Sequence, residues 1–205
     1  MRLRCPRLDR SGARAAGSLT RCHNPNMWSG TDRAKLLAFI DAIGQTAQSP
    51  GRVYFVGGAT AVLLGIRDQT IDIDIKLDPE PRGVFESIAM LKERLGLNVE
   101  LASPDHFIPP LPGWQERSEF ISRSGRVEFF HYDFYGQALA KIVRGHRSDL
   151  SDARALVTLG KVEAARLKAL FEKIRPNLIR YPALNAGDLD RRLDAFLQEA
   201  KSEQS

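Results

Sequence analysis

Residues 53–77 decide the fold of this chain, and they read VYFVGGATAVLLGIRDQTIDIDIKL. Residues 53–56 are β-branched and aromatic and end at a double glycine, which predicts a strand, a tight turn and then a short helix. Over residues 69–77 apolar and polar residues alternate strictly, as expected of one strand with a single buried face. On this strand Asp72 and Asp74 share the polar face.

The chain around this stretch is rich in strands first and helical later, without internal repeats. A proline-rich loop is expected over residues 103–113, anchored to the core by Trp114, unless this ring stacks a base. We expect helices over residues 32–46, 82–95, 135–144, 151–159, 162–174 and 188–200, and further strands over residues 98–101, 120–122 and 126–130. This order predicts an α+β fold with a C-terminal helical part.

The chain has 205 residues and a formal net charge of +5, which raises the question of nucleic-acid binding. Six arginines against one aspartate in residues 1–26 supply that charge, so the remaining residues are balanced. Residues 1–26 lack apolar periodicity and are expected to be a disordered basic tail, with an organellar transit peptide as the alternative. We assign residues 27–135 to an α+β core and residues 136–205 to a helical part packed on it.

The sequence has no long apolar run, and its cysteines are few, which bears on the compartment and on the class of protein. No apolar run reaches the roughly 20 residues that span a bilayer, so no membrane association is expected. Both cysteines, Cys5 and Cys22, lie in the tail with only His23 nearby, which argues against a disulfide scaffold or a zinc site. The remaining residues contain no cysteine, which fits a cytoplasmic protein.

The two aspartates and the two glycines suggest a site for a metal-bound phosphate. Asp72 and Asp74 lie within reach of one cation, and ligand sets made only of oxygen select Mg²⁺ or Mn²⁺. Gly57 and Gly58 would let the backbone approach a phosphate at the start of a helix. Each feature alone has a plainer explanation, because double glycines form turns and paired aspartates keep edge strands solvated.

Together these residues resemble the signature of the polymerase-beta-type nucleotidyltransferases. Val56-Gly57-Gly58, thirteen intervening residues and Asp72-Ile73-Asp74-Ile75 match its glycine pair, spacer and Asp-hydrophobic-Asp-hydrophobic order. The resemblance continues to residues 95–101, where small members place a third carboxylate. It also covers Lys141 to Asp152, similar to the toxin-type and abortive-infection nucleotidyltransferases. It implies the superfamily's short mixed sheet flanked by helices, followed by a helical part.

The resemblance also implies roles for single residues. Asp72 and Asp74 would hold Mg²⁺ or Mn²⁺, and Gly57 and Gly58 the triphosphate. Glu100 would accept the proton of the acceptor hydroxyl, with Glu128 as its rival.

The charged residues of the later helices have two interpretations. Lys141 would neutralise the phosphates, although with Arg144 it could form a solvated helix face. Asp152 is a further candidate for nucleotide binding, although Asp149 and Asp152 also suit the cap and first turn of a helix.

Two classes of function follow. In the first, the protein is a Mg²⁺-dependent enzyme that moves a nucleoside monophosphate from an NTP to a hydroxyl of an RNA end such as tRNA, a protein or a small molecule, with the toxin of a toxin-antitoxin pair as one such role. In the second, the domain is catalytically inactive and binds a nucleotide or a protein. A third hypothesis assigns RNA binding to the arginine-rich tail.

Overall fold

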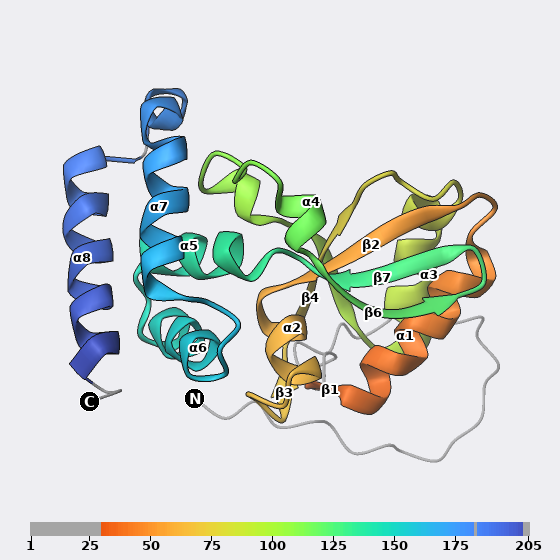
Figure 1. Ribbon diagram of the computed structural model, residues 1–205. Helices are drawn as coiled ribbons and strands as arrows, with labels where there is room; N and C mark the ends of the chain where they lie inside the picture. Colours follow the sequence, from red (N-terminus) through yellow and green to blue (C-terminus); the bar gives the residue numbers. More distant parts are fainter. Residues whose placement is uncertain (1–29, 183, 203–205) are drawn as a thin grey trace, which may run out of the picture.

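The computed structural model describes residues 30–182 and 184–202, and a five-stranded mixed sheet forms one half of it, beside the C-terminal helices (Figure 1). The strand order is β5-β4-β2-β7-β6. The strands are β2 (Gly51–Val56), β4 (Asp72–Leu77), β5 (Asn98–Leu101), β6 (Glu119–Ser124) and β7 (Val127–His131). β2 runs antiparallel to β4 and parallel to β7, β4 runs parallel to β5, and β6 and β7 form an antiparallel hairpin.

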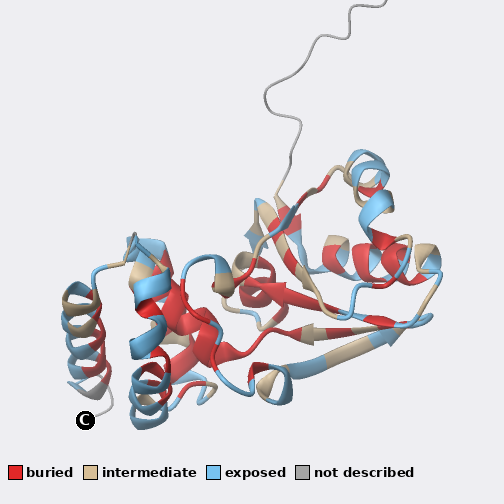
Figure 2. Ribbon diagram, turned by 90° about the horizontal axis from the view of Figure 1, so that it is seen from above, coloured by how far each residue is buried: buried red, intermediate tan, exposed pale blue. Residues whose placement is uncertain are grey.

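One face of this sheet is buried by α1 (Arg33–Thr46) and α3 (Val84–Leu95). Asp32 caps α1 by accepting a hydrogen bond from the Lys35 amide at 2.9 Å. The apolar side of each strand supplies the core between sheet and helices, where Phe55, Ile73 and Phe129 are fully buried. Figure 2 shows the buried residues, in red, gathered in the central strands and in the helix that follows them.

The prediction of one continuous strand over residues 69–77 is wrong at Ile71. Gln69 and Thr70 form a separate strand, β3 (Gln69–Thr70), which pairs antiparallel with β1 (Thr31–Asp32). The chain bends at Ile71, whose side chain is 68% exposed. The alternation of polar and apolar residues predicts which side each residue faces but not which strand it pairs with. It therefore does not reveal the bend at Ile71, where the chain passes from one sheet to the other.

The loop over residues 103–113 is mostly irregular as expected, but it includes a short 3₁₀ turn, η1 (Pro104–His106). It leads into α4 (Trp114–Arg117), and Trp114 is buried there. The indole stacks on Tyr132, with 4.6 Å between ring centroids, and meets Tyr54 edge-on at 5.0 Å. Trp114 therefore anchors the loop to the second face of the sheet, as the sequence predicts.

The C-terminal part is helical and has its own apolar core. It consists of α5 (Phe134–Arg144), α6 (Arg147–Thr158), α7 (Ala164–Ile174), η2 (Arg175–Arg180) and α8 (Ala186–Ser202). The remaining short helix, α2 (Gly57–Leu63), belongs to the first part of the chain and follows β2 directly. Helix α5 leads out of the sheet and is buried along most of its length between the sheet and the other helices. None of the described helices is long and apolar enough to cross a membrane.

The start of helix α6 differs from the prediction. Helix α6 begins at Arg147 rather than at residue 151, and no side chain caps it. Asp149 therefore lies in its first turn as predicted, but Asp152 does not, and both are buried and turned toward α5. The predicted tail, residues 1–26, lies outside the described residues.

Candidate active site

A cavity of about 320 Å³ lies where the last residues of β2 meet α5. Strands β4 and β5 form one wall, α5 forms another, and the loop after β5 closes a third side. The lining residues are Val56, Gly57, Asp72, Asp74, Glu100, Ala102, Ser103, Pro104, Phe107, Gln137, Ala140, Lys141 and Arg144. Among these are three carboxylates and two cations, which makes the cavity suited to a ligand that carries both phosphate and metal charges.

The three carboxylates are brought together by the pairing of β4 with β5. Asp74 lies opposite Glu100, and Asp72 lies opposite Asn98. The amide nitrogen of Asn98 donates to Asp72 Oδ1 at 2.7 Å and to Glu100 Oε1 at 3.2 Å. Asn98 thus orients two of the carboxylates, a role that the sequence does not reveal because an isolated asparagine carries no motif.

The carboxyl group of Asp74 has a raised pKa. Its burial, and then the negative charges of Asp72 and Glu100, raise the pKa of its carboxyl group to about 6. The positive charges of Arg144 and Lys141 act in the opposite direction without cancelling this effect. The site therefore holds more negative charge than its own residues neutralise.

Glu128 does not belong to this site, so its candidacy as the third carboxylate is wrong. It lies opposite Arg52 near the beginning of β2, whereas Asp74 lies opposite Val56 at its end. Four residues of extended chain separate these two positions, roughly 13 Å. The Glu128 carboxylate pairs there with the Arg52 guanidinium at 3.4 Å.

Gly57 and Gly58 are required by the structure for different reasons. Gly57 has φ +58°, and a Cβ atom on it would lie 2.9 Å from Asp74 Oδ2, so any side chain would crowd the carboxylate. At Gly58 a Cβ atom would lie 2.1 Å from Thr70 Oγ1, and Gly58 does not line the cavity. The observed contact thus explains Gly58 by packing on Thr70, and the predicted phosphate contact of Gly58 stays a prediction.

Gln137 is a residue of this site that the sequence analysis missed. Its side chain is 2% exposed and comes from the buried face of α5. Its Oε1 accepts a hydrogen bond from the Gly57 amide at 2.8 Å, and its Nε2 donates to the Tyr132 carbonyl oxygen at 2.7 Å. A glutamine within a helix segment predicted to be apolar could have indicated this role, because the oxygen and the nitrogen of a buried side-chain amide both need hydrogen-bond partners.

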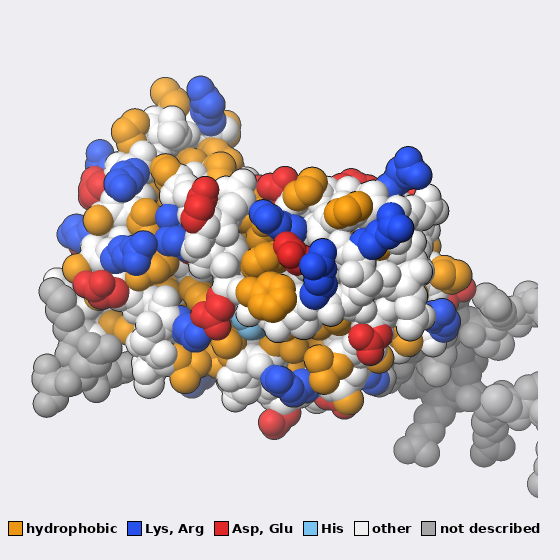
Figure 3. All heavy atoms as spheres, turned by 45° about the vertical axis from the view of Figure 1, so that its right-hand side comes forward, with side chains coloured by type: hydrophobic (Ala, Val, Ile, Leu, Met, Phe, Trp, Pro, Cys, Tyr) orange, Lys and Arg blue, Asp and Glu red, His pale blue; other side chains and the backbone are white. Residues whose placement is uncertain are grey.

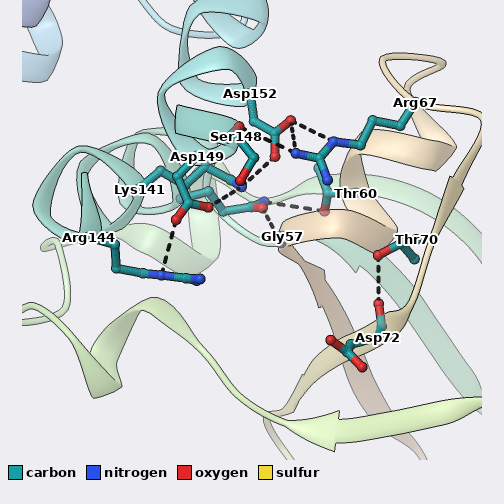
Figure 4. Close-up of polar contacts among 11 residues, drawn as sticks. Gly57, Thr60, Arg67, Thr70, Asp72, Lys141, Arg144, Ser148, Asp149 and Asp152 are labelled. Atoms are coloured by element: carbon teal, nitrogen blue, oxygen red, sulfur yellow. Dashed lines mark hydrogen bonds and ion pairs between the residues drawn. The ribbon is translucent and has the colours of Figure 1, made fainter. Parts of the chain in front are cut away.

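Lys141 is buried, so the solvated-face explanation is wrong for it. Its ammonium group donates to Asp152 Oδ2 at 2.6 Å and to Asp149 Oδ1 at 3.3 Å. Arg67, from the loop after α2, donates to the other oxygen of Asp152 at 2.8 Å. Figure 4 shows this network of charges from α5, α6 and the Arg67 loop, with Asp72 lying apart from it.

Two members of this network differ in their access to the cavity. Arg144 lines the cavity, and its Nε lies 3.2 Å from Asp149 Oδ2. Its guanidinium carbon lies 5.3 Å from the centre of the Phe107 ring. Asp152 is 4% exposed and does not line the cavity. Its position behind Lys141 suits it to orient that cation, and direct nucleotide binding by Asp152 stays a prediction.

The donor set at the carboxylates fits a hard divalent cation. All of its charged ligands are oxygens, and they carry excess negative charge. Among the described residues no three His, Cys, Asp or Glu side chains are placed to hold a metal by themselves. Mg²⁺ needs no such set, because it usually binds through one or two carboxylates and takes waters and substrate phosphates as its other ligands.

Comparison with known proteins identifies a family for this chain. Residues 34–189, about three quarters of the 205-residue chain, match the family described as nucleotidyltransferase of unknown function (DUF6036). No curated protein and no solved structure matches the chain. The matched stretch contains the carboxylates, the Gly57 turn and α5. The α+β fold with its mixed sheet and the cavity lined by carboxylates are consistent with this match. The chain belongs to the DUF6036 nucleotidyltransferase family.

Proposed function

We propose that this protein transfers a nucleoside monophosphate from an NTP to a hydroxyl group, with Mg²⁺ or Mn²⁺ as its cofactor. The observation that carries the proposal is the cavity in which Asp72, Asp74 and Glu100 face Lys141 and Arg144 across the Gly57 turn. Nucleotidyl transfer depends mainly on positioning the phosphates and neutralising their charge. Carboxylates for a metal on one wall and cations on the other are the groups that this reaction needs.

Asp72 and Asp74 would hold the metal, which when bound would neutralise phosphate charge and orient the reacting phosphate. Gly57 keeps the space next to Asp74 free of side-chain atoms, so that a phosphate can approach this carboxylate. Arg144 would neutralise the charge of the leaving pyrophosphate. Lys141, fixed by Asp149 and Asp152, would add a second positive charge at the same wall.

The reaction forms a bond between the acceptor oxygen and the α-phosphorus of the NTP. The bond from the α-phosphorus to the oxygen that bridges to the β-phosphorus breaks, and pyrophosphate leaves with the electron pair. Glu100 would accept the proton of the acceptor hydroxyl, since it lines the cavity and is held by Asn98. This carboxylate is exposed on the edge strand, so it is open to an incoming acceptor.

The acceptor and the biological role belong to the proposal as well. A terminal hydroxyl of an RNA such as tRNA, or a hydroxyl of a protein side chain, would suit the reaction. The resemblance to toxin-type members makes a toxin with a cognate antitoxin the proposed biological role, in a cytoplasmic setting. The second candidate, an inactive nucleotide-binding or protein-binding module, shares the cavity but predicts no product.

The test is label transfer from each α-phosphate-labelled NTP, with Mg²⁺ or Mn²⁺, to total tRNA and to total cell protein. Wild type should label one of the two fractions, and the double variant Asp72→Asn/Asp74→Asn should label neither. Labelling that persists in the variant would contradict the proposal. Wild type that binds an NTP and yields no labelled product in either fraction, nor on small molecules of a cell extract, would favour the inactive module.

A further inference from the structure

A second hollow, of about 360 Å³, lies at the other end of the sheet from the active-site cavity. Three arginines line it: Arg52 at the beginning of β2, Arg123 near the end of β6, and Arg126 in the turn between β6 and β7. Pro50, Gly51, Pro79 and Glu128 complete its lining. We call this hollow the arginine groove.

The arginine groove has an excess of positive charge. Glu128 is the one carboxylate among its lining residues, and it pairs with Arg52 at 3.4 Å. Arg126 donates to the Gln48 carbonyl oxygen at 3.4 Å, a contact that leaves its charge uncompensated. Arg123 is exposed and lies opposite Glu128 on β7, the same carboxylate that pairs with Arg52. Three guanidinium groups therefore share one carboxylate, which leaves a net positive charge for a negatively charged ligand.

Two aromatic rings continue the arginine groove along the same face of the sheet. Phe120, on the edge strand β6, is 56% exposed, and its ring meets that of Phe130 edge-on at 5.5 Å. The Arg52 guanidinium lies 5.7 Å from the centre of the partly exposed Phe130 ring. Figure 3 shows the face that this view brings forward, on which basic side chains lie among hydrophobic and acidic ones.

Guanidinium groups beside exposed rings match a ligand that carries both repeated negative charge and flat apolar surfaces. Phosphates pair with arginine, and unstacked bases pack on aromatic rings. A peptide made of acidic residues alone would use the charges but would leave Phe120 without a partner. We propose that the arginine groove and the Phe120–Phe130 pair bind single-stranded RNA.

The position of this surface relates it to the active site. Arg52 and Val56 lie on the same face of β2, so the arginine groove and the cavity open toward the same side of the sheet at opposite ends of one strand. A bound strand could therefore be held at the groove while its end reaches the cavity around α4. This second step rests on the proposed function and makes RNA the acceptor, whereas binding itself does not depend on it.

The test measures fluorescence anisotropy of a short labelled single-stranded RNA with the full chain. Arg123→Glu should weaken binding by about tenfold or more, and the slope of log affinity against log salt should become shallower by about 0.7 for each phosphate that the variant no longer neutralises. Phe120→Ala should weaken binding by about tenfold, because a base then has no ring to stack on. Arg94→Glu is the matched control, since Arg94 is exposed on α3, across the sheet, and should leave the affinity within about twofold of wild type.

Two results would overturn the inference. If Arg123→Glu and Phe120→Ala bind RNA as wild type does, RNA binds elsewhere, for example to residues 1–26. If polyglutamate competes as well as RNA and Phe120→Ala binds normally, the surface recognises an acidic protein. Binding of RNA by Asp74→Asn and of Mg²⁺-NTP by Arg123→Glu separates the two sites. RNA binding at the groove without label transfer would contradict the proposed function and leave this inference standing.

Discussion

Two groups of carboxylates near the candidate active-site cavity differ in how their charge is balanced. Asp149 and Asp152, on α6, are buried against Lys141, with Arg144 and Arg67 as further partners. Asp72, Asp74 and Glu100, on β4 and β5, have an asparagine amide between two of them and no ion pair among the described residues. The pKa of Asp74 is raised to about 6 by burial and by its acidic neighbours.

The difference shows which acids serve the fold and which are suited to a ligand. A buried carboxylate normally has a partner, because an uncompensated buried charge destabilises the folded state. The first group is neutralised by side chains of the protein itself. The second is left with excess negative charge inside a cavity, and a bound cation would remove this repulsion.

The largest expected difference between the two groups is the effect of removing the charge of Asp152 on stability. Asp152→Asn should lower the free energy of unfolding by about 3 kcal/mol, because it removes the closest partner of a buried ammonium group and only Asp149 remains. Asp74→Asn, the matched change in the other group, should leave stability unchanged or higher. Urea denaturation of both variants at neutral pH tests this. Equal losses of stability would show that both groups are structural.

Activity should respond in the opposite way. Asp74→Asn should lower nucleotidyl transfer at least about a hundredfold, equivalent to about 2.7 kcal/mol, because under the proposed function it removes one of the two carboxylates that hold the metal. The measurement is label transfer at saturating NTP and Mg²⁺, with the thermal unfolding midpoint of the same sample as the check on folding. An active Asp74→Asn protein would contradict the proposed role of this carboxylate as a metal ligand.

The pH dependence of stability gives a further difference. Asp74 has a raised pKa in the folded state, so the folded protein binds its proton more tightly than the unfolded chain does between the ordinary value of 3.8 and about 6. Raising the pH through this window should therefore cost metal-free wild type about 2 kcal/mol of stability relative to Asp74→Asn. Urea denaturation from pH 4 to pH 7 measures this, and Mg²⁺ should reduce the loss. A constant difference across that range would contradict the repulsion.

The sequence could predict the parts of this site that local pattern encodes. Alternation places Asp72 and Asp74 on one face, and Gly57 follows a strand whose end is marked by its glycines. Pairing of β4 with β5 then brings Glu100 to them, as the resemblance implies. Glu128 also lies on the polar face of a strand, and only the parallel pairing of β2 with β7 shows that it lies at the end of β2 away from Asp74.

What the sequence could not predict depends on tertiary contacts. Whether Lys141 is solvated or buried is decided by α6 folding back over α5, which no spacing within α5 records. The bend at Ile71 depends on the pairing of β3 with β1. Asn98 and Gln137 act through amides that carry no charge and no motif, so their roles appear only once their partners are placed.

The smallest expected effect concerns Gln137, which joins α5 to the turn beside the carboxylates. Gln137→Leu leaves the Gly57 amide and the Tyr132 carbonyl oxygen without their partner and should cost about 1–2 kcal/mol of stability. It should also raise the KM for NTP more than it lowers kcat, because the turn next to Asp74 is no longer fixed. Gln137→Glu keeps an oxygen for the Gly57 amide and should recover part of the KM. If Gln137→Leu is destabilised and yet has the wild-type KM and kcat, the turn is held for folding alone, and the link between α5 and the carboxylates carries no function.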